Sequence, residues 1–91
     1  MNNLTQHAQV RAQQRGIRIQ TIELVLEMGD RKVRLPGNSF AISVSKARAV
    51  ELVRLGLPPA DIERTANVVA VISGTDGAVI TVEHRSRRFF H

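Results

Sequence analysis

Two apolar segments near the C-terminus, separated by four turn-forming residues, constrain the fold more than any other feature of this sequence. Residues 67–73 (Asn-Val-Val-Ala-Val-Ile-Ser) are apolar at every central position, which is typical of a central strand covered on both faces. Residues 74–77 (Gly-Thr-Asp-Gly) favour a turn, and residues 78–83 return as the partner strand. The sequence therefore predicts an antiparallel hairpin near the centre of a sheet.

A second hairpin is predicted upstream, where polar and apolar residues alternate. Residues 32–35 (Lys-Val-Arg-Leu) and 40–44 (Phe-Ala-Ile-Ser-Val) follow this pattern, and residues 36–38 (Pro-Gly-Asn) favour a turn between them. Alternation indicates that one face of this hairpin is buried.

The N-terminal part of the chain favours helix. Thr5 is the expected N-cap of a helix over residues 6–15, which contain neither glycine nor proline. Gly16 can adopt the left-handed conformation that ends such a helix, with Ile17 packing back onto it.

A second helix is predicted over about residues 20–28, with Gly29 as another helix stop. Its apolar residues recur at helical spacing, at Ile22, Val25, Leu26 and Met28. Together the two segments form an N-terminal helical hairpin.

A helical insertion is predicted between the two β-hairpins. Ser45 can cap a third helix that runs to about Leu55. Residues 56–59 (Gly-Leu-Pro-Pro) end this helix, and residues 59–63 favour a further helical turn because proline fits the first helical position. The residues expected on the inner side of the third helix are Ala49, Val50 and Val53.

The expected fold is therefore α+β: a helical hairpin packed on a mostly antiparallel sheet of about four strands, with a helical insertion between two β-hairpins. The 91 residues form a single domain over 1–91, with a flexible or docking tail at about 86–91. The absence of cysteine excludes disulfides and thiolate zinc sites. No cofactor is expected, because neither a P-loop nor a G-x-G-x-x-G motif is present.

The N-terminus has no basic start followed by an apolar run, and no stretch approaches the roughly 18 apolar residues that span a bilayer. A cytoplasmic protein without membrane association is therefore expected.

The chain is basic, with a net charge of +5 from thirteen Lys and Arg against eight Asp and Glu. Arginine supplies most of this charge, and its planar fork suits bidentate phosphate contacts. This composition favours an anionic partner, such as nucleic acid or an acidic protein. Ordinary surface solubility explains the same charge equally well.

The most suggestive group is His7, Arg11 and Arg15, whose spacing places all three on one face of the first helix. An imidazole beside two guanidinium groups is what RNA cleavage without a metal requires. The imidazole would take the proton of the 2′-hydroxyl, and an arginine would stabilise the charge that builds on the phosphate. The alternative is a solvated polar stripe on an amphipathic helix.

His84 is a second candidate, as a general acid. Strict alternation places it on the apolar face of the last strand, with Glu83 and Arg85 on the opposite face. Arg64 precedes the central strand and is expected at the same end of the sheet. A structural histidine and a surface arginine are the alternative interpretations.

The C-terminal tail is basic and then aromatic. Arg85, Arg87 and Arg88 can contact phosphates while Phe89 or Phe90 stacks on a base. Alternatively, the two phenylalanines dock on the domain or on a second subunit. No metal site is predicted, because no histidine has another at the i+3 or i+4 spacing of a ligand pair.

Three motifs resemble a family of small bacterial domains of unknown function that is related to RelE-like ribonuclease toxins. They are H-A-x-x-R-x-x-x-R-G-I at residues 7–17, I-x-x-V-L-x-x-G at 22–29 and D-G-x-V-I-T-V at 76–82. The resemblance covers about half of the chain. This sequence departs from the family at Glu83, where an aromatic residue is frequent, and in the helical segment from about 45 to 64.

The resemblance implies a toxin-like, RNA-binding α+β domain that acts as a metal-independent endoribonuclease. Its site would contain His7, Arg11 and Arg15, with His84 or Arg85 contributing from the sheet. The partners would be RNA or the ribosome, and an acidic antitoxin-like protein. The alternatives are a non-catalytic binding module for nucleic acid or an acidic protein, and a small homo-oligomeric interaction protein.

Overall fold

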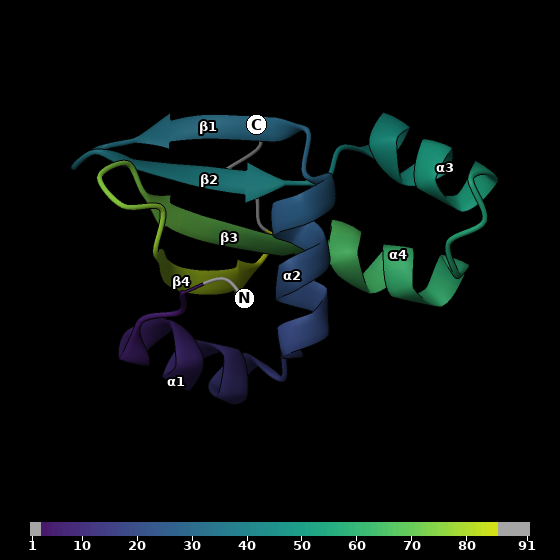
Figure 1. Cartoon of the computed structure of the whole chain (residues 1–91). Coiled ribbons are helices and arrows are strands. Elements are labelled where there is room, and N and C mark those ends of the chain that lie inside the picture. Colours follow the sequence, from purple (N-terminus) through teal and green to yellow (C-terminus); the bar gives the residue numbers. More distant parts are fainter. Residues whose placement is uncertain (1–2, 86–91) are drawn as a thin grey trace.

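A four-stranded antiparallel sheet lies at the centre of the computed structural model, which describes residues 3–85 (Figure 1). The strands lie side by side in chain order: β1 (Arg31–Leu35), β2 (Ser39–Ser43), β3 (Val68–Ser73) and β4 (Val79–His84). The helices are α1 (Gln6–Arg15), α2 (Ile19–Met28), α3 (Lys46–Arg54) and α4 (Pro59–Ala66). This arrangement confirms the predicted α+β class and the helical insertion between the two β-hairpins.

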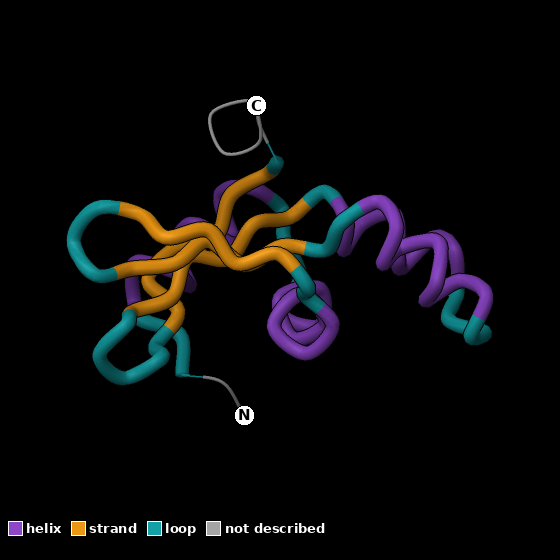
Figure 2. Tube along the Cα trace, turned by 90° about the horizontal axis from the view of Figure 1, so that it is seen from above, coloured by secondary structure: helices purple, strands orange, loops and turns teal. Residues whose placement is uncertain are grey.

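The register of the strands defines two faces of the sheet. Val82, Ala70 and Ile42 lie opposite one another on neighbouring strands, and they pack with residues of α2 in the main core. We call this side the helix face. Figure 1 shows α2 running across the strands, and Figure 2 shows it end-on against one side of the sheet. The other side, which we call the far face, carries Glu83 on β4 and Val69 on β3.

The last hairpin contains a β-bulge that the sequence did not predict. Val71 pairs with Thr81 whereas Ile72 pairs with Val79, so Ile80 is the additional residue on β4. Strict alternation along β4 therefore holds only after the bulge.

Helix α1 lies along the edge strand β4. The Thr5 side chain accepts a hydrogen bond from the backbone N–H of Ala8 at 3.1 Å, which confirms the predicted N-cap. Ala8 and Ala12 are almost fully buried, and their small side chains let the helix approach the strand closely. The helix ends at Gly16, whose φ of 65° is the left-handed conformation expected there.

Helix α2 ends at Met28 as predicted, but Gly29 is needed for a different reason than Gly16. Its backbone is extended, with a φ of −61°. A Cβ atom at this position would lie 2.5 Å from the carbonyl oxygen of Val25 and 2.7 Å from Cγ2 of Ile42. Glycine is therefore required by close packing rather than by a left-handed turn.

Helices α3 and α4 form an arm that projects from one end of the sheet (Figure 2). Ser45 caps α3 as predicted, accepting from the backbone N–H of Arg48. The predicted inner face of α3 is right for Ala49, which packs on the small core there, but wrong for Val50 and Val53, which are 51% and 38% exposed. Leu52, at 1% exposed, is the buried residue instead. The reason is that α4 is a complete helix rather than a single turn, and Leu52 packs against its Ile62.

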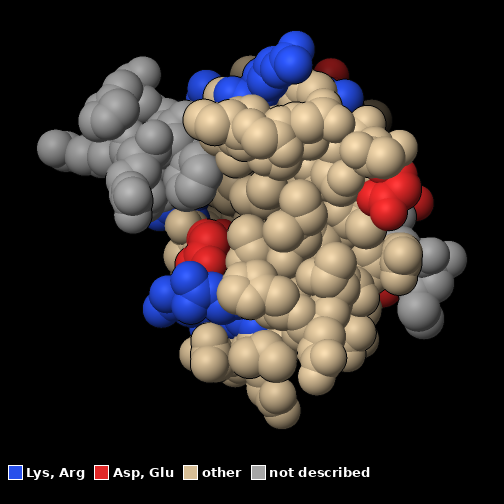
Figure 3. All heavy atoms as spheres, turned by 90° about the vertical axis from the view of Figure 1, so that its left-hand side faces the viewer, with Lys and Arg blue, Asp and Glu red and all other residues tan. Residues whose placement is uncertain are grey.

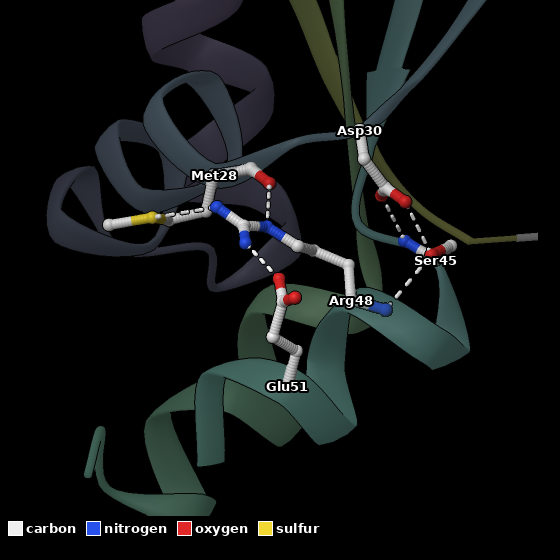
Figure 4. A network of polar contacts seen from close by, with 5 residues as sticks. All are labelled: Met28, Asp30, Ser45, Arg48 and Glu51. Carbon is white, nitrogen blue, oxygen red and sulfur yellow. Dashed lines mark hydrogen bonds and ion pairs between the residues drawn. The ribbon is translucent and has the colours of Figure 1, made fainter. Parts of the chain in front are cut away.

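Polar contacts join this arm to the sheet and α2 (Figure 4). The Arg48 guanidinium donates to the backbone oxygen of Met28 and also contacts Glu51. Asp30 accepts hydrogen bonds from the backbone N–H and the hydroxyl of Ser45, at 2.8 and 2.6 Å. Among residues 3–85, no helix is both long and apolar enough to cross a membrane.

Candidate functional site

Two arginines of α1 meet a carboxylate of β4. The Nε of Arg11 lies 2.9 Å from Oε2 of Glu83, and the Nε of Arg15 lies 3.3 Å from Oε1. Their i, i+4 spacing places both guanidinium groups on the side of α1 that faces the strand. Each oxygen of Glu83 therefore has one guanidinium as its neighbour.

These ion pairs leave much of both arginines available. The Nε of Arg11 is enclosed and its contact with Glu83 lacks hydrogen-bond geometry, so this contact is an ion pair only. Each guanidinium approaches Glu83 most closely through Nε, and no hydrogen bond of the described residues involves a terminal amino group of either arginine. Those groups therefore remain able to bind an anion.

The group formed by Glu83, Arg11 and Arg15 is partly exposed and carries a net positive charge. The side chains of Arg11 and Arg15 are 34% and 45% exposed, and that of Glu83 is 22% exposed. Figure 3 shows an acidic group lying against a cluster of basic atoms on this side of the molecule. A solvent-borne anion can therefore reach the two cations.

His7 lies one helical turn before Arg11 and is exposed. Its ring makes no hydrogen bond or ion pair with any residue between 3 and 85. Residues four apart on a helix have their Cβ atoms about 5–6 Å apart. His7 and Arg11 are therefore neighbours on the surface of α1.

His84 lies on the helix face, away from the two arginine side chains. Its Nε2 donates to the backbone oxygen of Arg15 at 2.9 Å. Because each helical residue adds about 1.5 Å, this contact lies about 12 Å along α1 from His7. The two histidines thus lie at opposite ends of α1, and the predicted grouping of His84 with His7 is not what the geometry shows.

Arg64 and His84 instead line one small cleft, of about 210 Å³. Arg64 also forms an ion pair with Asp61 at 2.8 Å. The shared cleft agrees with the expectation that both residues lie at the same end of the sheet.

The side chain of Arg85 makes hydrogen bonds to two other segments of the backbone. Its guanidinium donates to the backbone oxygens of Ala66 and Val44, at 3.3 and 3.5 Å. Arg87 and Arg88, for which phosphate contacts were also predicted, lie outside the described residues, as do Phe89 and Phe90. Within residues 3–85, no group of three or more His, Cys, Asp or Glu residues is arranged to hold a metal ion.

Two residues of interest were missed from the sequence. Glu83 was placed on the opposite face from His84 but was not identified as the partner of Arg11 and Arg15. The i, i+4 spacing of Arg11 and Arg15 can be read from the sequence, whereas the position of α1 along β4 cannot. Arg18, which lines the cleft with His84, occupies the N-cap position of α2 but is not a capping residue type.

Comparison of the chain with protein-family models, with curated proteins and with solved structures gave no match.

Proposed function

We propose that this chain is a toxin-like RNA-binding domain that cleaves RNA without a metal ion. The observation that carries the proposal is the pair of guanidinium groups held by Glu83, with their terminal amino groups free of hydrogen bonds to the described residues. Two such groups side by side match the bidentate geometry of a phosphate. The net charge of +5 favours the same partner.

His7 supplies the proton transfer in this proposal. Its imidazole takes the proton of the 2′-hydroxyl while the 2′-oxygen forms a bond to phosphorus. The bond from phosphorus to the 5′-oxygen breaks, and this oxygen takes up a proton from water. Arg11 and Arg15 stabilise the negative charge that builds on the phosphate.

Glu83 acts as a positioning residue. Its carboxylate fixes both guanidinium groups and does not contact the reacting atoms. Glu83→Gln keeps the shape of the side chain but removes its charge. This variant should therefore bind RNA more tightly, because one opposing charge is removed, yet cleave it more slowly, because the arginines lose their fixed geometry.

The first experiment is cleavage and binding of total RNA by the purified protein with a chelator present. His7→Ala should abolish cleavage and leave binding nearly intact. Arg11→Ala and Arg15→Ala should each weaken binding and reduce the magnitude of its salt slope by about one. Arg54→Ala on α3 is the matched control, because it removes an exposed arginine far from α1 and should change neither.

The same experiment decides between this proposal and a non-catalytic binding module. The observation that favours the module is that no hydrogen bond of the described residues fixes the His7 ring. Salt-dependent binding without cleavage, by the wild type and by His7→Ala alike, would establish the module. Binding that does not depend on Arg11 or Arg15 would contradict both functions.

A further inference from the structure

A second basic site lies beyond the C-terminal end of α1, between the start of α2 and the end of α4. The cleft of about 210 Å³ is lined by Arg18, Thr21, Arg64, Asn67 and His84 among others. A neighbouring cleft of about 330 Å³ shares Arg18, Thr21 and Arg64 with it. These three residues therefore form the wall common to both clefts.

The N-terminus of α2 opens into this region without a cap. Its N-cap residue is Arg18, whose side chain makes no capping hydrogen bond, and its first turn contains no acidic residue. The first helical hydrogen bond is donated by the N–H of Ile22 to the backbone oxygen of Arg18. The preceding N–H groups, of residues 19–21, therefore have no acceptor in the helix, and the helix dipole adds about half a positive charge there.

Thr21 is an independent sign of a missing partner. It is only 8% exposed, and its hydroxyl makes no hydrogen bond to any residue that the structure describes. Thr21 lines both clefts, and its oxygen is not among the fully enclosed, unpartnered side-chain atoms of the described residues. Hydroxyl groups of largely buried residues are normally paired, so that of Thr21 is available to a ligand in these clefts.

The charges around the cleft favour an anion. Arg18 and Arg64 contribute two positive charges, and Asp61 contributes one negative charge through its ion pair with Arg64. Both side chains of that pair are 47% exposed, and exposed pairs contribute only about 0–1 kcal/mol. An anion can therefore compete with Asp61 for the Arg64 guanidinium.

We infer that the wall shared by the two clefts binds a phosphate group, held by the N–H groups of Gln20 and Thr21, the Thr21 hydroxyl and the guanidinium groups of Arg18 and Arg64. A water molecule takes about 30 Å³, so a cleft of about 210 Å³ has room for a phosphate group. His84 completes the wall, with its Nε2 already donating to Arg15. The inference does not depend on cleavage by His7.

The test is a titration of the ¹⁵N-labelled protein with inorganic phosphate at constant ionic strength, followed by NMR. The amide signals of Gln20 and Thr21 should shift and saturate. The amide of Arg48 at the N-terminus of α3 is an internal control, because it already donates to the Ser45 hydroxyl and should not respond. A short RNA oligonucleotide is titrated in parallel, and a response of Gln20 and Thr21 to it alone would assign the phosphate to a nucleic-acid backbone.

Two variants link these shifts to the cleft. Thr21→Val replaces the hydroxyl with a methyl group of similar size, and Arg64→Ala removes a cation from an exposed position. Each should weaken phosphate binding several-fold, whereas Arg54→Ala should not. The inference is overturned if neither probe shifts Gln20 and Thr21, if Arg48 responds equally, or if Arg64→Ala binds phosphate as tightly as the wild type.

Discussion

Two regions of the molecule are stabilised in different ways: the sheet with α1 and α2, and the arm formed by α3 and α4. The main core contains ten buried residues, from both N-terminal helices, the connection between them, and β2, β3 and β4. The core of the arm contains three, Val44, Leu52 and Ile62. Because hydrophobic stabilisation scales with the apolar area removed from water, the arm has much less of it.

Polar contacts add to the stabilisation that this small core provides. Arg48 binds the last turn of α2 through the backbone oxygen of Met28, and Asp30 binds both polar groups of Ser45 (Figure 4). The arm also exposes large apolar side chains, with Leu55 at 69%. We therefore expect the arm to open locally at a lower free energy than the global unfolding of the domain.

The largest expected effect lies in the main core. Ile22 is fully buried, whereas Ile19 in the same helix is 41% exposed. Ile22→Ala should lower the free energy of unfolding by about 2–5 kcal/mol, because it leaves a cavity. Ile19→Ala should change it far less. Urea denaturation followed by circular dichroism measures both values, and equal losses would show that α2 does not bury the face that carries Ile22.

A smaller global effect is expected in the arm. Leu52→Ala removes the central side chain of the smaller core, and Leu55→Ala changes an exposed leucine of the adjoining turn. If the arm opens locally, Leu52→Ala should reduce hydrogen-exchange protection in α3 and α4 strongly while global stability falls by about 1 kcal/mol. A global loss as large as that of Ile22→Ala would mean that the arm and sheet unfold as one unit.

The difference between these regions also explains which parts of the fold the sequence could predict. The caps at Thr5 and Ser45 and the left-handed Gly16 are local features, so a few neighbouring residues determine them. The buried face of α3 depends on where α4 lies, so the prediction of Ala49, Val50 and Val53 missed the buried Leu52. The local sequence pattern predicted the helices and strands, whereas the packing of these elements against one another decides which side chains are buried.

The same limit applies to the candidate sites. The shared face of His7, Arg11 and Arg15 follows from helical spacing and could be predicted. Their relation to Glu83 depends on α1 lying along β4, which is a long-range contact. Arg18 was missed because its role depends on the distant residues Arg64 and His84.

The smallest expected effect concerns the polar connection between the two regions. Burial would raise the pKa of Asp30, but the hydrogen bonds from Ser45 and the charge of Arg48 outweigh it and lower the pKa below its ordinary value of 3.8. A carboxyl whose pKa is lower in the folded state stabilises the fold above its unfolded pKa. That contribution is lost as the pH falls through the lower, folded-state value.

Asp30→Asn should therefore be less stable than the wild type at neutral pH, and the difference should shrink well below pH 3.8. Ser45→Ala is the companion variant. It removes the hydroxyl that binds Asp30 and the α3 cap, so its own loss should contain a pH-independent part from the cap. Thermal unfolding of the wild type, both single variants and the double variant is measured at neutral pH and well below pH 3.8. The comparison separates the stabilisation by the Asp30 charge from that by the α3 cap. A gap between the wild type and Asp30→Asn that is the same at both pH values would show that the Asp30 charge does not help to hold the arm.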